Sequence, residues 1–86
     1  MKTFLLKISS PEGDLFCDNV ESISLRGTEG ELMIMAGHIP FVTAVVECNL
    51  KITLVDESER EAHTGGGMLT VSGDKTVFLS GDFGWL

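Results

Sequence analysis

The chain has 86 residues, of which 13 are acidic and 6 are basic, so its formal net charge at pH 7 is −7. Nucleic-acid binding depends on basic side chains that displace counterions, so this charge argues against a nucleic-acid partner. The hydrophobic content of 43% argues against intrinsic disorder, and the length suits one small domain, which we expect over residues 1–86.

Apolar and polar residues alternate with a period of two along most of the chain, as at Leu50, Ile52 and Leu54. This period places every second side chain on one face of a strand. No segment follows a helical period, and turn signals separate the alternating segments, so we predict an all-β fold, an antiparallel β-sandwich of about eight to ten short strands. In chain order, the predicted strands are 4–8, 15–17, 20–25, 32–35, 41–46, 50–55, 60–64, 68–72 and 76–80.

The candidates for metal binding or nucleophilic chemistry are Cys17, His38, Cys48 and His63. Structural zinc sites usually take ligands in close pairs, but no two of these residues lie within nine positions of each other. We therefore predict no metal and no cofactor. A small thiol enzyme that uses Cys48 with His38 or His63 stays open as a minor alternative. Two cysteines are also too few for a disulfide-stapled secreted domain, which favours a reduced, cytosolic protein.

The glycines at 65–67 could suggest a phosphate cradle, but a P-loop needs a Lys-Ser/Thr pair and a helix directly after its glycines. Here a predicted strand follows, so we interpret these glycines as a turn or bulge. No apolar run approaches the length of a membrane span, which argues against direct membrane insertion. A chain of this length also has little room to enclose a substrate pocket. We therefore expect an interaction protein without catalytic activity.

The last six residues, 81–86, include Phe83, Trp85 and Leu86. Exposed apolar clusters are costly, so these side chains must either fold back on the sheet or meet a partner. We favour the first alternative, and the sequence leaves both open.

Four segments in the right order resemble one known family. They are 6–13, 20–23, 28–40 with its continuation 43–44, and 66–71. The stretch 28–40 is the most specific, because it carries Glu-Gly, a spacer and Gly-His-x-Pro at the spacing typical of the family. The chain thus resembles the N-terminal β-sandwich domain of the epsilon subunit of F-type ATP synthases.

Some positions depart from the family pattern. Met33 stands where the family usually has Gly, Ala36 replaces the Pro before Gly-His, and 46–48 replaces a Lys-Pro-Gly turn. Most members also continue beyond the position of Leu86 into a helical hairpin that can inhibit ATP hydrolysis. The resemblance therefore implies a divergent short form without that hairpin, and we expect no such inhibition from it.

The resemblance implies a non-catalytic rotor subunit of the central stalk that links the gamma subunit to the c-ring. It would support the coupling of proton or sodium translocation to ATP synthesis, and it would meet the alpha/beta assembly of F1 only indirectly. Its expected place is peripheral, at the cytoplasmic face of the cell membrane, as part of the F1 sector. The alternative is a free-standing β-sandwich that binds a ligand or a peptide at a sheet edge.

The resemblance also implies two sets of contact residues. Glu31 in particular makes physical sense near basic loops of the c-ring, as an exposed ion-pair partner. The family's gamma-facing positions match Ser10, His38 and Thr43, and its c-ring loop matches Glu29, Gly30 and Glu31.

Overall fold

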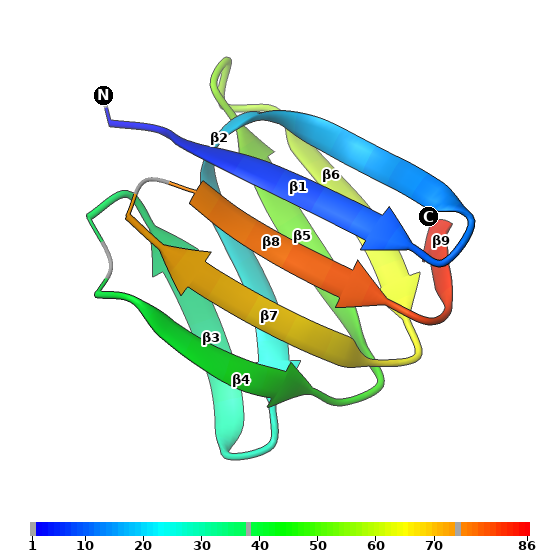
Figure 1. The fold of residues 1–86 in the computed structure, drawn as a ribbon. Coiled ribbons are helices and arrows are strands. Elements are labelled where there is room, and N and C mark those ends of the chain that lie inside the picture. Colours follow the sequence, from blue (N-terminus) through cyan, green and yellow to red (C-terminus); the bar gives the residue numbers. More distant parts are fainter. Residues whose placement is uncertain (1, 38, 74) are drawn as a thin grey trace.

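In the computed structural model, the described residues are 2–37, 39–73 and 75–86, and they form nine strands and no helix (Figure 1). The predicted all-β sandwich of eight to ten strands is therefore confirmed. The strands are β1 (Phe4–Ser10), β2 (Gly13–Gly27), β3 (Gly30–Met35), β4 (Phe41–Val45), β5 (Cys48–Leu54), β6 (Glu59–Thr64), β7 (Gly67–Ser72), β8 (Lys75–Ser80) and β9 (Phe83–Trp85).

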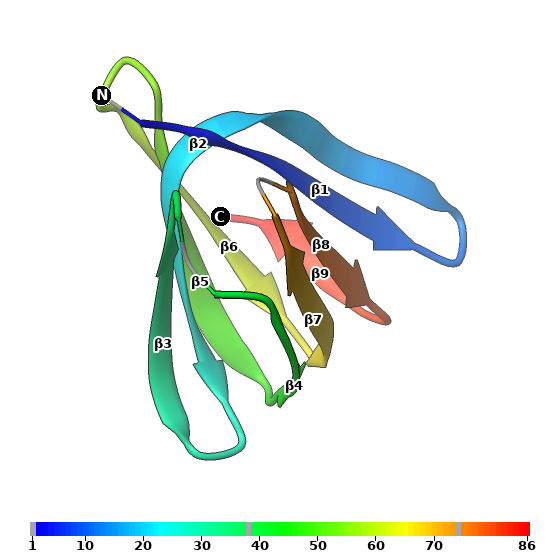
Figure 2. The same cartoon turned by 60° about the vertical axis from the view of Figure 1, so that its left-hand side comes forward.

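The strands form two layers that share β2. One layer has the order β1-β8-β7-β4, and the other contains β3, β2, β5, β6 and β9 (Figure 2). The first half of β2 pairs with β1, and its second half pairs with β3 and β5. The register of the β2–β5 ladder shifts between Val20 and Ser22, so Glu21 is the extra residue of a β-bulge. Bulges bend a strand and increase its twist, which lets β2 pass from one layer to the other.

One pairing differs from the antiparallel expectation. β1 and β8 run parallel, from Leu5 opposite Lys75 to Ser9 opposite Leu79, and all the other pairings between described strands are antiparallel. A short hairpin can join only antiparallel neighbours, but β1 and β8 lie far apart in the sequence. Their relative direction is therefore set by the layer that they complete rather than by a local turn.

The core lies between the two layers and follows the predicted period of two. Leu6 and Ile8 of β1 face Thr76 and Phe78 of β8 in the ladder, and all four are buried. Aliphatic side chains from β2 and β5 close the core from the other layer. The buried apolar residues are Phe4, Leu6, Ile8, Val20, Ile23, Leu25, Ile34, Val45, Leu50, Ile52, Ala62, Leu69, Val71 and Phe78.

The buried hydroxyls of Thr64 and Ser80, at the ends of β6 and β8, form a chain of hydrogen bonds in which both hydroxyls have partners. Their oxygens are 2.8 Å apart, and the Ser80 hydroxyl donates to the carbonyl of Asp82 at 2.8 Å. The Thr64 hydroxyl can then donate to Ser80, while its oxygen accepts the N–H of Gly66 at 3.0 Å. Buried polar groups cost little when they are paired in this way, so the network fixes the start of the glycine turn.

The C-terminal residues fold back on the sheet, which is the alternative that we favoured from the sequence. β9 pairs with β6, and the N–H of Leu86 donates to the carbonyl of Glu61 at 2.9 Å. The guanidinium carbon of Arg60 lies 3.8 Å from the centroid of the Trp85 ring, a cation–π contact. The rings of Phe83 and Phe16 also contact the Trp85 ring edge-on, with distances between ring centroids of 5.0 Å and 5.8 Å.

The glycines of the 65–67 turn are fixed by close backbone approach. A Cβ added to Gly67 would lie 1.9 Å from the carbonyl oxygen of Leu79. Gly66 has φ +113, and its Cβ would lie 2.7 Å from the carbonyl oxygen of Val45. Gly65 and Gly66 connect β6 to β7 and Gly67 begins β7, so the positive φ and close backbone approach expected of these glycines are present.

We expect Gly67→Ala to lower the free energy of unfolding by about 3 kcal/mol, because β7 must move away from β8 to admit the methyl group. Gly81→Ala is the matched control, since nothing lies within 4 Å of a Cβ there and its φ is not left-handed. The control should change the free energy by less than about 0.5 kcal/mol. Urea denaturation of both variants is the measurement, and equal midpoints would contradict the proposed clash.

The turn between β5 and β6 gives a second prediction. Asp56 accepts hydrogen bonds from the Ser58 hydroxyl at 2.5 Å and from the Ser58 N–H at 3.0 Å. These bonds favour the carboxylate and lower the pKa of Asp56 below its usual 3.8. Because the folded pKa lies below the unfolded one, the stabilisation is present above the unfolded pKa and is lost as the pH falls through the folded pKa.

We therefore expect Asp56→Asn to lower the melting temperature near neutral pH and to have a smaller effect at a pH below both pKa values. Thermal melts at the two pH values test this. In a Ser58→Ala background the hydroxyl donor is gone, so the effect of Asp56→Asn at neutral pH should shrink. A carboxyl titration by NMR with a midpoint at or above 3.8 would contradict the proposed cause.

Candidate functional site

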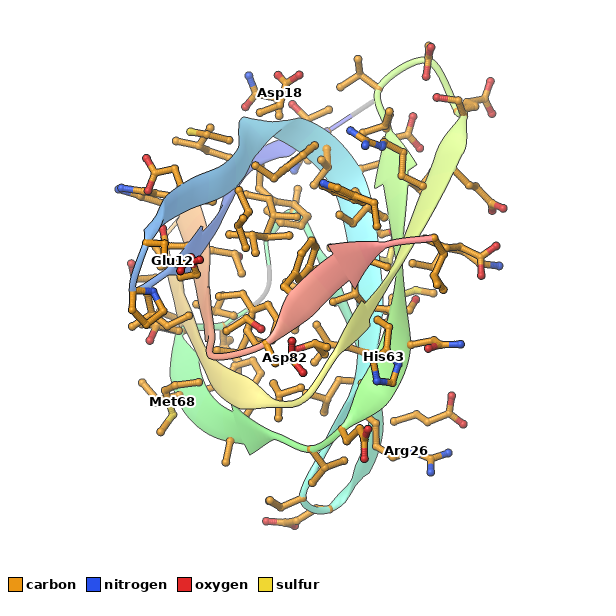
Figure 3. The ribbon with its side chains drawn as sticks, turned by 90° about the vertical axis from the view of Figure 1, so that its right-hand side faces the viewer. Glu12, Asp18, Arg26, His63, Met68 and Asp82 are labelled. Atoms are coloured by element: carbon orange, nitrogen blue, oxygen red, sulfur yellow. The ribbon has the colours of Figure 1, made fainter. Side chains whose placement is uncertain are left out.

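The outer face of the β1-β8-β7-β4 layer carries large apolar side chains. Val42 is 62% exposed, Met68 is 43% exposed and Leu79 is 53% exposed. The ladders place Ala44, Met68 and Leu79 side by side across β4, β7 and β8. Figure 3 shows that Met68 points away from the interior. A solvated face of an antiparallel sheet is usually polar, so this face is a candidate contact surface, and we call it the apolar face.

Ser10 lies at the rim of the same layer, where β1 ends. Its hydroxyl donates to the carbonyl of Gly13 at 3.3 Å and accepts the N–H of Glu12 at 3.2 Å. These bonds hold the β1–β2 turn in shape. Its side chain is half-buried, so Ser10 stands at one edge of the apolar face.

Thr43 lies on β4 at the other side of the layer, but its side chain points inward. It is paired with the buried Leu69, and its hydroxyl donates to the carbonyl of Ala44 at 3.3 Å. Val42 and Ala44 are the residues of this strand that point outward, and both are exposed. His38, the third predicted gamma contact, lies outside the described residues.

The predicted c-ring loop forms the turn between β2 and β3. Gly27 pairs with Gly30, which leaves a turn of two residues, and Gly30 has φ +124. Glu29, Gly30 and Glu31 are all exposed. The Glu31 side chain is 82% exposed, and its Oε2 lies 3.9 Å from Nη2 of Arg26. The pair is loose and solvated, so Glu31 is accessible to a cationic partner.

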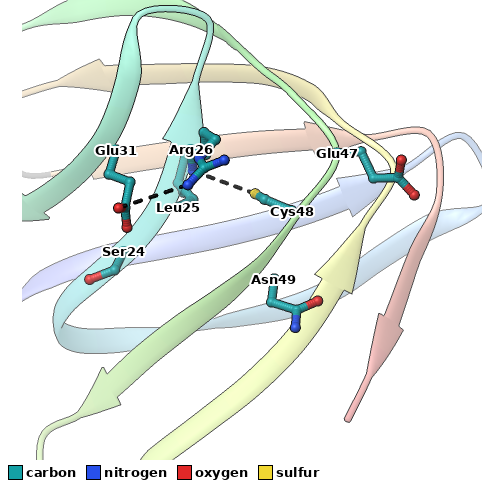
Figure 4. Close-up of a pocket in the computed structure, with 7 residues that line it drawn as sticks. All are labelled: Ser24, Leu25, Arg26, Glu31, Glu47, Cys48 and Asn49. Carbon is teal, nitrogen blue, oxygen red and sulfur yellow. Dashed lines mark hydrogen bonds and ion pairs between the residues drawn. The ribbon is translucent and has the colours of Figure 1, made fainter.

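Next to this turn lies an open polar pocket of about 280 Å³ (Figure 4). Arg26, Glu31 and Glu47 supply its charges, and Cys48 is among the residues that line it. The N–H of Arg26 donates to Sγ of Cys48 at 3.4 Å, so the thiol takes part in local structure. The sequence indicated neither this pocket nor the apolar face, because the pattern of alternation does not reveal which outward-facing residues meet.

The thiol-enzyme alternative requires Cys48 to reach a histidine. Cys48 pairs with the buried Thr64, whereas His63 pairs with Asn49 and points to the opposite side of the sheet. The ring nitrogens of His63 lie 2.7 Å from Asn49 Oδ1 and 3.3 Å from Glu47 Oε2. The structure therefore does not bring Cys48 and His63 together, and His38 lies outside the described residues.

Within residues 2–37, 39–73 and 75–86, no group of three or more His, Cys, Asp or Glu side chains is arranged to hold a metal ion. The same part of the chain contains no helix with the length and apolar character needed to cross a membrane. The features that the described residues do present are two exposed surfaces, one apolar and one acidic. These features define a β-sandwich whose surfaces suit contacts with other proteins.

The comparison with family models agrees with this class. The model described as "ATP synthase, Delta/Epsilon chain, beta-sandwich domain" matches residues 3–85. The chain therefore belongs to the family of ATP synthase delta/epsilon chains, through its β-sandwich domain. The resemblance seen in the motifs is thus confirmed.

Several epsilon chains are similar to this chain in sequence. The sodium-ion-specific ATP synthase epsilon chain of Acetobacterium woodii is 36% identical over 84 residues, which cover 98% of this chain and 63% of that protein. The epsilon chain of Caldicellulosiruptor bescii is 41% identical over 85 residues, or 99% and 61% of the two chains. The epsilon chain of Chlorobium limicola is 35% identical over 81 residues, or 94% and 92%. This chain thus spans less than two thirds of the first two relatives and nearly all of the third.

Solved structures show the same fold. A chain in the OSCP/F1/c-ring part of the Euglena gracilis mitochondrial ATP synthase superposes with a TM-score of 0.91 at 19% identity, over 96% of this chain and 53% of that one. A chain of the Tetrahymena thermophila mitochondrial ATP synthase central stalk/c-ring superposes with a TM-score of 0.79 at 16% identity, over 96% and 66%. At these identities the likeness establishes the fold.

Proposed function

We propose that this chain is a non-catalytic subunit of the central stalk of an F-type ATP synthase rotor. It links the gamma subunit to the c-ring and supports the coupling of proton or sodium translocation to ATP synthesis. The observation that carries the proposal is the match of residues 3–85 to the β-sandwich domain of the delta/epsilon chain. The fold shared with a chain of an OSCP/F1/c-ring assembly and with a chain of a central stalk/c-ring assembly supports it.

The apolar face is the proposed gamma contact. It lies between Ser10 on β1 and Thr43 on β4, two of the three residues that match gamma-facing family positions, and it is apolar where a free sheet would be polar. Burying Val42, Met68 and Leu79 would stabilise a complex by removing apolar area from water. Because Thr43 points inward, the direct contacts on β4 come from Val42 and Ala44, while Thr43 holds the strand in place.

The turn between β2 and β3 is the proposed c-ring contact. Glu29 and Glu31 present two carboxylates on a short turn, and the net charge of −7 favours a partner with basic loops. Exposed ion pairs add little affinity but fix register and speed association. The subunit would thus sit at the cytoplasmic face of the cell membrane as a peripheral part of F1, in indirect contact with the alpha/beta assembly and without a cofactor.

The proposal predicts that the chain co-purifies with the gamma subunit of its own organism and restores ATP-driven ion pumping to a complex depleted of it. Normal coupling in the depleted complex would overturn the proposal.

Leu79→Asp should lower the affinity for gamma by about tenfold or more, because it buries a charge in an apolar contact. The measurement is the dissociation constant, obtained by calorimetric titration of purified gamma with the wild type and with each variant.

Val55→Asp is the matched control for Leu79→Asp. Val55 is 56% exposed, close to the 53% of Leu79, but it follows β5 at the turn toward β6, away from the apolar face. This variant should bind gamma as the wild type does. Equal losses in the two variants would mean that gamma does not dock on the apolar face.

A separate prediction concerns Glu31. We expect Glu31→Gln to reduce ATP-driven ion pumping by reconstituted complexes about two- to fivefold at low salt and less at high salt, since an exposed ion pair is screened. Glu57→Gln removes the same charge at the β5–β6 turn, which Figure 1 shows at the opposite end of the molecule, and should have no such effect. An identical salt dependence in both variants would argue against a specific c-ring contact.

A further inference from the structure

Strand β3 has an open edge. Among the described strands it pairs only with β2. The two-residue turn makes Gly27 and Gly30 a hydrogen-bonded pair, and bonded and non-bonded pairs alternate along an antiparallel ladder. The backbone N–H and C=O groups of Glu31, Met33 and Met35 therefore point away from β2, toward the open edge.

A hydrogen bond on β2 supports this alternation. The carbonyl of Arg26, which is opposite Glu31 in the ladder, accepts the N–H of Val46 at 3.0 Å and so points away from β3. Glu31 and Arg26 are thus a non-bonded pair. By the same alternation, Met33 with Ser24 and Met35 with Ser22 are non-bonded pairs as well. The open edge offers three backbone donors and three acceptors in a row.

The side chains beside this edge are apolar and exposed. Met33 is 57% exposed and Met35 is 56% exposed, and Ile39, shortly after the strand, is 75% exposed. Natural sheets protect their edges with charged side chains, above all lysine, and with proline, bulges or very short strands. β3 has six residues and no proline, its one charged side chain is Glu31 near its start, and its ladder with β2 shows no register shift. By contrast, the outermost strand β9 has only three residues.

We propose that the edge of β3 is a docking site for an extended segment of a partner protein, which adds a strand to this layer. The segment would carry apolar residues opposite Met33 and Met35 and a basic residue opposite Glu31. Cross-strand pairs of these kinds stabilise a sheet, and main-chain hydrogen bonds supply the rest of the affinity.

Charge decides between a partner and a second copy of this chain. Each copy carries −7, so edge-to-edge pairing of two copies brings like charges together. Glu31, whose side chain is 82% exposed, instead favours a cationic segment. The site is distinct from the apolar face, which lies on the other layer, and it shares only Glu31 with the proposed c-ring contact. A peptide can therefore test it without gamma or a c-ring.

The test uses the purified, isotope-labelled chain and a short capped peptide that alternates valine and threonine and ends in lysine. We expect the peptide to slow amide exchange at Glu31, Met33 and Met35, with no change at Leu32 and Ile34, whose N–H groups already bond β2. A matched peptide that ends in glutamate should bind at least about tenfold more weakly. Equal binding of the two peptides, or protection elsewhere on the sheet, would overturn the proposal.

Met33→Pro removes one open-edge donor and breaks no bond to β2, so it should weaken lysine-peptide binding about tenfold. Met33→Thr keeps the donor and should stay within about threefold of the wild type. If thermal melts show that Met33→Pro does not fold, Met35→Pro provides the same test at the next open-edge donor. An unchanged affinity in the folded proline variant would overturn the proposal. Concentration-dependent protection of Met33 without peptide would also overturn it, because the occupant would then be a second copy.

Discussion

The structure depends on one strand, β2, that serves both layers. Its first half bonds β1 and its second half bonds β3 and β5, so backbone hydrogen bonds as well as side-chain packing join the layers. The bulge at Glu21 makes this possible, because it releases one residue from the β5 ladder and increases the twist. One carboxylate oxygen of Glu21 is buried without a hydrogen-bond partner among the described residues, which is a local cost of the bend.

The sequence predicted the parts of the fold that local pattern controls. Leu50 and Ile52 are buried as expected, and the glycines at 65–67 lie where β6 connects to β7, with the close backbone approach that was expected. The predicted strands 15–17 and 20–25 are in fact one strand, because the polar Asp18 and Asn19 lie on its exposed half rather than in a turn. The strand at 83–85 was not predicted, since its pairing depends on β6 and on the contact of Trp85 with Arg60.

Long-range features could not be predicted because no local signal encodes them. The parallel pairing of β1 and β8 joins residues 5–9 to residues 75–79, which lie far apart in the sequence. The apolar face depends on the register that brings Met68 beside Leu79, and in the sequence each is one more apolar residue in a strand. The direction of the Thr43 side chain could not be predicted either. The family match gives its position in the sequence, but only the pairing with the buried Leu69 shows that it points inward. The surface nature of Glu29 and Glu31, in contrast, follows directly from the turn signal around them.

The far end of β2 joins the two contact surfaces of the proposed rotor subunit. Gly27 pairs with Gly30, at the start of the turn that carries Glu29, and also with Val45 of β4, which borders the apolar face. A Cβ at Gly27 would lie 3.3 Å from Leu32 Cδ1 and 3.4 Å from the carbonyl of Ala44, so the three strands approach closely there. In the proposed rotor role the domain would transmit torque between two partners, and this role requires that it not bend between them. Gly27 bonds Gly30 across the turn, and the adjacent carbonyl of Arg26 accepts the N–H of Val46 at 3.0 Å, which ties β4 to β2. These bonds meet the requirement, because they must break before the acidic turn and the apolar face can move apart.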